Sequence, residues 1–275
     1  MRKRIPWQGW VIPVIFGVSW YLLGHADLIH TGIFPRIHQV WEAIIFLTQR
    51  AALQTHLWVS LQRVLIGFAT AGLIGVPIGL GLGWAPQLKP WFDPTLHFLR
   101  QIPPVAWIPL FIMWFGIGEA SKNAVIFYAA FFPIMLNTQL GVEQIPRTYW
   151  EVADLYQFTL WKSLRRLVLP GSAPAIITGL RLGMGMSWRA LVAAEMLAAS
   201  SGLGYLIMTA RSLVRLDEMV VGMLIIGVMG VAIDGIFALI ASQLLPWTKS
   251  VSGVRSTDLG RTSYEESATT DTTGV

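Results

Sequence analysis

Residues 57–84 read LWVSLQRVLIGFATAGLIGVPIGLGLGW, a stretch of 28 residues in which Arg63 is the only charged side chain. About 20 consecutive apolar residues are enough for an α-helix to cross a membrane. Small residues recur here at every fourth position, and so along one face of the helix: Gly67, Ala71, Gly75, Gly79 and Gly83. Such a stripe lets another helix pack closely. It predicts a packing seam inside one bundle, with a seam between two copies as the alternative.

The whole chain has the composition of a membrane protein. Of its 275 residues, 54% are hydrophobic and 13% charged, against about 25% charged residues in ordinary soluble domains. Apolar stretches predict an all-α polytopic domain over residues 1–249 with about six transmembrane helices, near 11–23, 57–84, 105–115, 125–140, 174–199 and 219–245. We expect the first to be an uncleaved helix rather than a signal peptide. The third is short and interrupted by Pro109, which predicts a tilted or broken helix buried in protein.

The distribution of basic residues predicts the orientation. With the amino terminus inside, twelve lysines and arginines lie inside and five outside, which is the bias expected of cytoplasmic loops. Residues 37–48 alternate apolar and polar positions with helical spacing and should form a helix along the outer interface. Residues 250–275, rich in Ser, Thr and Gly, are predicted to be a disordered cytoplasmic tail. We therefore expect a multi-pass protein of the inner (plasma) membrane with both termini cytoplasmic.

The sequence lacks the residues and motifs that several kinds of chemistry require. There is no cysteine and no G-x-x-x-x-G-K-[ST] phosphate loop, so the chain should not hydrolyse ATP by itself. The five histidines stand singly, without the spacing of metal ligands: His25, His30, His38, His56 and His97. No catalytic residue, metal site or bound cofactor is expected. The net charge of +5 is spread over short loops, so nucleic acid is not an expected partner.

The segment between the fourth and fifth apolar stretches carries the most specific motif. Glu151-Val152-Ala153-Asp154-Leu155-Tyr156-Gln157 is followed, nine residues later, by Leu167-Val168-Leu169-Pro170. Here Val152, Leu155 and Tyr156 supply an apolar helix face, and Glu151 near the helix start suits the helix dipole. The segment is either a knob that a soluble protein could grip or an amphipathic helix held by lipid headgroups.

This motif resembles the E-A-A-x-x-x-G-x(9)-I-x-L-P loop of ABC importer permeases. Gln157 stands where that loop has glycine, and glutamine favours a continued helix or a different turn. The resemblance implies a coupling loop over about residues 141–170 that contacts the ATPase. The residues of this sequence that stand in the coupling loop are Glu151, Val152, Ala153, Leu155, Tyr156, Gln157, Leu169 and Pro170, of which Val152 and Gln157 depart from the family pattern, as does Leu167 at the isoleucine position.

Further segments resemble the nitrate/sulfonate/bicarbonate branch of these permeases, over roughly residues 35–247. They are IPPVAWIPL (102–110), WFGIGE (114–119), GLR (179–181) and AAEM (193–196). SGLGY (201–205) and DEMVV (217–221) look nearer to the aliphatic sulfonate and taurine members. The resemblance implies a type I importer with two permease copies, a binding protein outside, and two ATPase subunits that bind ATP and magnesium.

Ionisable residues inside apolar stretches are the candidates for the translocation pathway, since they are costly in lipid. Arg189 is the preferred candidate for contact with an anion, whereas Arg181 and Asp234 could instead pair across helices as a structural tie. The full set of pathway candidates is Asn137, Thr138, Arg181, Ser187, Trp188, Arg189 and Glu195.

Three functions compete at this point. The first is an ABC importer permease for a small anion, most simply a homodimer, carrying an aliphatic sulfonate or taurine, with nitrate or bicarbonate as the alternative. The second is a carrier driven by an ion gradient, which the absence of an internal sequence repeat disfavours. The third is a membrane-embedded enzyme, for which no motif is present. The docking loop favours the permease.

Overall fold

The computed structural model describes residues 8–25 and 35–244, so the predicted tail at 250–275 lies outside the described residues. The described chain consists of helices and their connections. The α-helices are α1 (Gln8–His25), α2 (Ile37–Gln49), α3 (Ala52–Trp84), α4 (Lys89–Gln101), α5 (Ile108–Phe115), α6 (Glu119–Glu143), α7 (Arg147–Leu155), α8 (Leu160–Ser163), α9 (Leu169–Ala198), α10 (Leu203–Ser212) and α11 (Leu216–Leu244). Short 3-10 helices η1 (Pro86–Leu88) and η2 (Pro104–Trp107) and the π-helix η3 (Leu164–Val168) complete the set.

Within residues 8–25 and 35–244, four helical segments are long and apolar enough to cross a membrane: Ala52–Trp84, Glu119–Glu143, Leu160–Ala198 and Leu216–Leu244. A fifth is added if Pro86–Gln101 and Pro104–Phe115, bent by 90°, form one broken span. The all-α polytopic fold is thus confirmed, with four or five such spans where about six were expected. Helix α1 forms where the first span was predicted but is not among them, because polar Gln8 and His25 take up part of its 18 residues.

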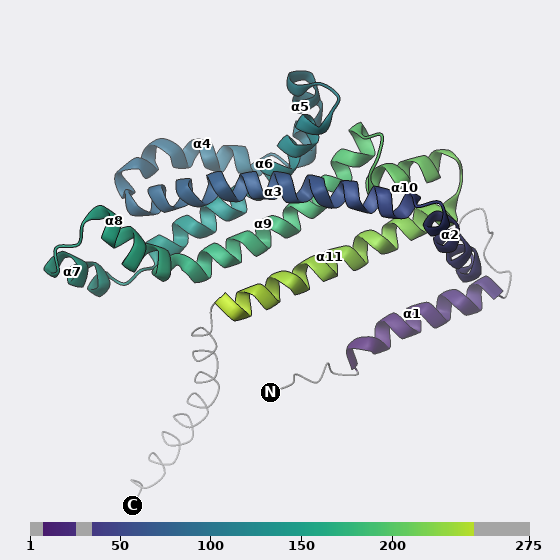
Figure 1. Ribbon diagram of the computed structural model, residues 1–275, viewed down its shortest axis with the longest axis horizontal. Helices are drawn as coiled ribbons and strands as arrows, with labels where there is room; N and C mark the ends of the chain where they lie inside the picture. Colours follow the sequence, from purple (N-terminus) through teal and green to yellow (C-terminus); the bar gives the residue numbers. More distant parts are fainter. Residues whose placement is uncertain (1–7, 26–34, 245–275) are drawn as a thin grey trace, which may run out of the picture.

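The broken third span is observed, but its predicted burial is wrong for one face. The bend falls between α4, which ends at Gln101, and η2, which begins at Pro104, whereas Pro109 lies in the first turn of α5 and does not interrupt a helix as predicted. On α5, Ile108 and Phe111 are buried against α6, while Met113 and Trp114 are exposed. Because α5 has only eight residues and projects from the bundle (Figure 1), it contacts its neighbours with a single face.

The small-residue stripe of α3 is the seam along which α3 packs on α6. A Cβ atom added at Gly67 would lie 2.6 Å from Cγ2 of Ile126, and one at Gly83 would lie 2.7 Å from Cβ of Val142. Helix α9 packs on an adjacent face of α6, where a Cβ atom at Gly179 would lie 2.8 Å from Cβ of Asn137. The first of the two predicted readings, a seam within one bundle, is therefore confirmed, and α3, α6 and α9 form the core (Figure 1).

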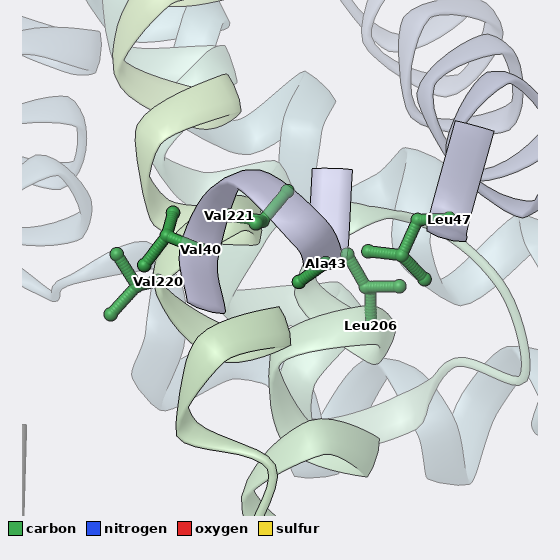
Figure 2. Packing of buried hydrophobic residues seen from close by; sticks show 6 residues of the cluster. All are labelled: Val40, Ala43, Leu47, Leu206, Val220 and Val221. Carbon is green, nitrogen blue, oxygen red and sulfur yellow. The ribbon is translucent and has the colours of Figure 1, made fainter. Parts of the chain in front are cut away.

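Helix α2 packs one face on α10 and α11 at the end of the bundle opposite to α7 and α8 (Figure 1). Its predicted bounds of 37–48 agree with the observed helix. Figure 2 shows the contact, in which Ala43 lies beside Leu206 and Val40 beside Val220. Trp41, on the opposite face of α2, is exposed. The apolar stripe of this helix is thus divided between protein and surroundings.

Candidate functional site

Helix α7 is anchored to the core by its inner face. Ala153 is buried, and the ring of Trp150 lies 6.2 Å from the ring of Trp84 at the end of α3. Trp150 also packs against a buried apolar cluster of Val142, Ile145 and Val168. The segment between α6 and α9 is therefore held as a fixed protrusion at one end of the bundle.

The outer face of the same segment is apolar and exposed. Leu155 is 80% exposed and Leu160, on α8, is 79% exposed. Val152 and Tyr156, the other members of the predicted apolar face, are also exposed, as is Glu151. Exposed apolar side chains on a rigid support are typical of a surface that binds another protein. We call Val152, Leu155, Tyr156, Leu160 and Trp161 the docking face.

The chain turns sharply after α7 at Gln157. This residue has a φ of 49°, in the left-handed region that glycine adopts without strain. Backbone N–H groups of Gln157 and Phe158 donate to the carbonyl oxygens of Asp154 and Ala153 at 2.9 Å each, which closes the helix end. A continued helix, one of the two predictions for Gln157, is thus wrong. Hydrogen bonds impose the glycine-type turn on glutamine.

An open groove of about 830 Å³ lies beside the protrusion, between α6 and α9. Asn137, Gln144, Tyr149, Arg166 and Thr178 contribute its polar lining. Asn137 is thus the one predicted pathway residue in this groove, and its side-chain amide donates to the carbonyl oxygen of Pro133 at 2.8 Å. Pro170, predicted for the coupling loop, lines the groove as well, whereas Leu169 beside it is exposed at the start of α9.

Thr138 and Ser187 do not reach the groove. The Thr138 hydroxyl is buried in the α3–α6 seam facing Gly79 and donates to the carbonyl oxygen of Ile134 at 2.8 Å. Ser187 is buried and donates to the carbonyl oxygen of Ile126 at 3.4 Å. Both positions serve helix packing in this chain, so sequence proximity to Asn137 and Arg189 did not indicate which way the side chains point.

Arg181, Trp188 and Arg189 line a second, smaller cavity of about 230 Å³ between α9 and α11. The Arg181 guanidinium donates to Asp234 through two bonds, from Nε to Oδ1 at 2.7 Å and from Nη2 to Oδ2 at 2.6 Å. The predicted alternative, a tie across helices, is what the structure contains. The indole N–H of Trp188 donates to the carbonyl oxygen of Ile226 on α11 at 3.1 Å.

Glu195 lies in neither cavity but in a buried ion network at the end near α10. Arg63 is the hub of this network. Its Nη1 donates to Oε1 of Glu195 at 2.9 Å, its Nε to Oε2 of Glu119 at 2.6 Å, and Nη1 also to the carbonyl oxygen of Ser201 at 2.6 Å. The network joins α3, α6, α9 and the turn before α10. The contacts of Glu195 are those of a structural residue. They do not support its predicted place in the translocation pathway.

The turn at 201–204 wraps around the Glu195 carboxylate. The backbone N–H of Gly204 donates to Glu195 Oε2 at 3.0 Å, and that of Leu203 donates to the Ser60 hydroxyl at 2.9 Å. Gly202 has a φ of 116°, and a Cβ atom there would collide with the carboxylate of Glu195. The sequence held a signal for this network, namely one basic and one acidic residue in two different apolar stretches together with the SGLGY segment.

Within residues 8–25 and 35–244, no group of three histidine, aspartate or glutamate side chains could hold a metal ion. His56 instead accepts a hydrogen bond from the backbone N–H of Gly202 at 3.0 Å.

Long apolar helices around a close-packed core, with one fixed apolar protrusion between two of them, fit a membrane subunit that contacts a partner protein. Residues 72–250 match the family model of the binding-protein-dependent transport system inner membrane component. The chain is 33% identical to a Bacillus subtilis permease named for aliphatic sulfonates, over 92% of both chains. It is 32% identical to the Escherichia coli taurine permease, over 83% of this chain and 85% of that one. Identity to a nitrate import permease of Synechocystis is 34%, over 69% of both chains.

The chain therefore belongs to this family of binding-protein-dependent permeases. It is a multi-pass inner-membrane subunit of an ABC importer, whose family works with ATPase and substrate-binding partners. The relatives are transport subunits rather than enzymes, and ATP hydrolysis takes place on the partner ATPase. The resemblance inferred from the coupling motif is thus confirmed, and the enzyme and gradient-driven carrier hypotheses are set aside.

Proposed function

We propose that this chain is the permease of an importer for an aliphatic sulfonate or taurine. Support comes from the sulfonate and taurine relatives, which match 92% and 83% of the chain. Nitrate is the second candidate, because a nitrate permease is similar over 69% of the chain. Bicarbonate is a further alternative within the family. The experiment below determines which anion is transported.

The docking face is proposed to contact the ATPase in the cytoplasm, and both termini are proposed to lie on that side of the membrane, as the distribution of basic residues predicts. The observation that carries this proposal is the exposure of Leu155 and Tyr156 on a protrusion anchored by Trp150 and Ala153. Closure of an ATPase dimer would displace two such rigid protrusions together and transmit the movement to α6 and α9. ATP and magnesium are bound by the ATPase subunits, and this chain needs no cofactor of its own.

A second copy of this chain is proposed to complete the pathway, with two ATPase subunits below and a binding protein outside. The groove between α6 and α9 is open in the single chain and carries Asn137 and Thr178. A facing copy would close it into a passage lined from both sides. The passage would be polar on one wall at least, as an anion leaving water requires.

The experiment uses the complex of this chain with its cognate ATPase and binding protein in liposomes. ATP hydrolysis is compared with taurine, methanesulfonate, nitrate and bicarbonate, for the unaltered complex and for Glu151→Lys. One anion should stimulate hydrolysis, and the substitution should abolish the stimulation, because it reverses a charge on the exposed side of α7.

Glu42→Lys is the matched control, since Glu42 is an exposed glutamate on α2 at the opposite end of the bundle. It should leave co-purification of the ATPase unchanged. If Glu151→Lys and Glu42→Lys reduce ATPase binding equally, or if no ATPase binds the unaltered chain, the proposed docking face is wrong.

A further inference from the structure

Arg189 is an arginine without a partner inside a membrane-crossing segment. It lies within Leu160–Ala198, is exposed, and forms no hydrogen bond or ion pair with the residues in 8–25 and 35–244. A lone guanidinium facing lipid is costly, so such residues face protein or water and mark sites for ligands. The side chain opens into the cavity of about 230 Å³ between α9 and α11.

The geometry of α9 directs this guanidinium along the cavity. Arg181, Gly185 and Arg189 follow at steps of four and so share one helix face. A Cβ atom at Gly185 would lie 3.8 Å from Nη2 of Arg189, which shows that the guanidinium reaches back over the glycine. Across the cavity, a Cβ atom at Gly230 would lie 3.4 Å from the indole nitrogen of Trp188. Two glycines thus leave room between the arginines and α11.

The charges lining this cavity sum to plus one. Arg181 is neutralised by Asp234 through their two hydrogen bonds, which leaves Arg189 as the uncompensated charge. The other lining residues carry no ionisable group: Met184, Gly185, Trp188, Gly230, Ile233 and Phe237. The volume corresponds to several water molecules at about 30 Å³ each, enough for a small oxyanion.

We propose that the cavity between α9 and α11 binds a monovalent oxyanion through Arg189, and that Asp234 makes the site unfavourable for divalent anions. An anion with one negative charge, such as a sulfonate or nitrate, matches the net charge of the lining. A dianion such as sulfate carries one negative charge more than the lining compensates, because Asp234 cancels the charge of Arg181 and so lowers the net charge of the lining from two to one. The proposal rests on the proposed function, because it defines the charge class of the anion carried.

Equilibrium binding of radiolabelled methanesulfonate and radiolabelled sulfate tests this, with the permease–ATPase complex in lipid nanodiscs and without the binding protein. Arg189→Gln should weaken methanesulfonate binding by about tenfold to a hundredfold, the usual effect of losing a charged hydrogen bond. Gly230→Leu should weaken it as well by filling the cavity. Unlabelled nitrate should compete. Asp234→Asn should raise sulfate binding by about tenfold, since the lining then carries two positive charges.

Arg50→Gln, at the end of α2, is the matched control and should bind methanesulfonate like the unaltered complex. Unchanged binding in Arg189→Gln, or no binding of methanesulfonate and nitrate by an intact complex, overturns the site. If Arg189→Gln weakens methanesulfonate binding but Asp234→Asn does not raise sulfate binding, the proposed selection against divalent anions is wrong. If the complex forms and hydrolyses ATP in response to an anion while these variants bind alike, only this inference fails; if no ATPase binds, the proposed function fails.

Discussion

Arg63 and Glu195 form the most deeply buried ion pair among the described residues, with side chains 4% and 0% exposed. Removing one partner of a buried pair leaves an uncompensated charge and costs about 3–5 kcal/mol. We therefore expect Glu195→Gln to lower the stability of the protein by about 3 kcal/mol. Thermal unfolding in lipid nanodiscs, followed by circular dichroism, measures the effect.

Glu119 is the matched control for that prediction, because it binds the same arginine but its side chain is 59% exposed. In Glu119→Gln the buried Arg63 still pairs with Glu195, and water can reach the substituted side chain, so this variant should lower the unfolding temperature less than Glu195→Gln does. Equal losses for the two variants would show that burial does not set the strength of this network.

The sequence predicted the location of a residue correctly where its chemical type alone determines that location. It failed where the location depends on the direction in which the side chain points. The exposed apolar character of Leu155 and Tyr156 follows from the motif and agrees with the structure. Thr138 and Ser187 were polar residues near the preferred arginine, yet both point into helix seams. Gln157 was ambiguous because the hydrogen bonds that close its turn are accepted by Asp154 and Ala153, three and four positions earlier in the chain.

The close packing of helix α3 on α6 depends on glycines, which have no side chain. A Cβ atom at Gly79 would lie 2.7 Å from Cβ of Thr138 on α6, so alanine there must push the two helices apart. Overpacking of this kind costs about 1–3 kcal/mol. We expect Gly79→Ala to lower the unfolding temperature of the protein in nanodiscs.

Gly81 on the same helix has nothing within 4 Å of its added Cβ atom. Gly81→Ala should therefore be neutral or stabilising, since alanine is favoured over glycine in helices by about 1 kcal/mol. A loss in Gly81→Ala equal to that in Gly79→Ala would mean that crowding in the α3–α6 seam is not the cause of the loss.

The positions of the helices could be predicted from the sequence more accurately than the neighbours against which each helix packs. Hydropathy located α3, α6, α9 and α11, and the short, proline-containing third stretch predicted a broken helix there, because both signals are local. Hydropathy alone does not state what covers an apolar face. The burial of only one side of α5 and the division of the α2 stripe depend on how many neighbours reach them, which is a property of the whole bundle.

The whole molecule separates three tasks along its length. The docking face lies at one end, the ion network and α2 at the other, and the α3–α6–α9 core joins them (Figure 1). Since the helices of the core approach one another so closely at glycines that no Cβ atom would fit, we expect the core to move as a unit rather than to bend locally. Displacement of the protrusion should therefore reach the cavities beside α9.

The last prediction concerns the strength of the docking face as a protein contact. Leu155 is 80% exposed on α7. Removing an apolar anchor of a protein interface costs about 2 kcal/mol or more of binding free energy. Leu155→Glu should therefore weaken binding of the cognate ATPase by about thirtyfold or more, measured as a dissociation constant in nanodiscs. Leu213→Glu changes a leucine that is 58% exposed at the end of α10 and should leave this constant unchanged. If the two variants bind the ATPase alike, lipid headgroups rather than a protein cover the docking face.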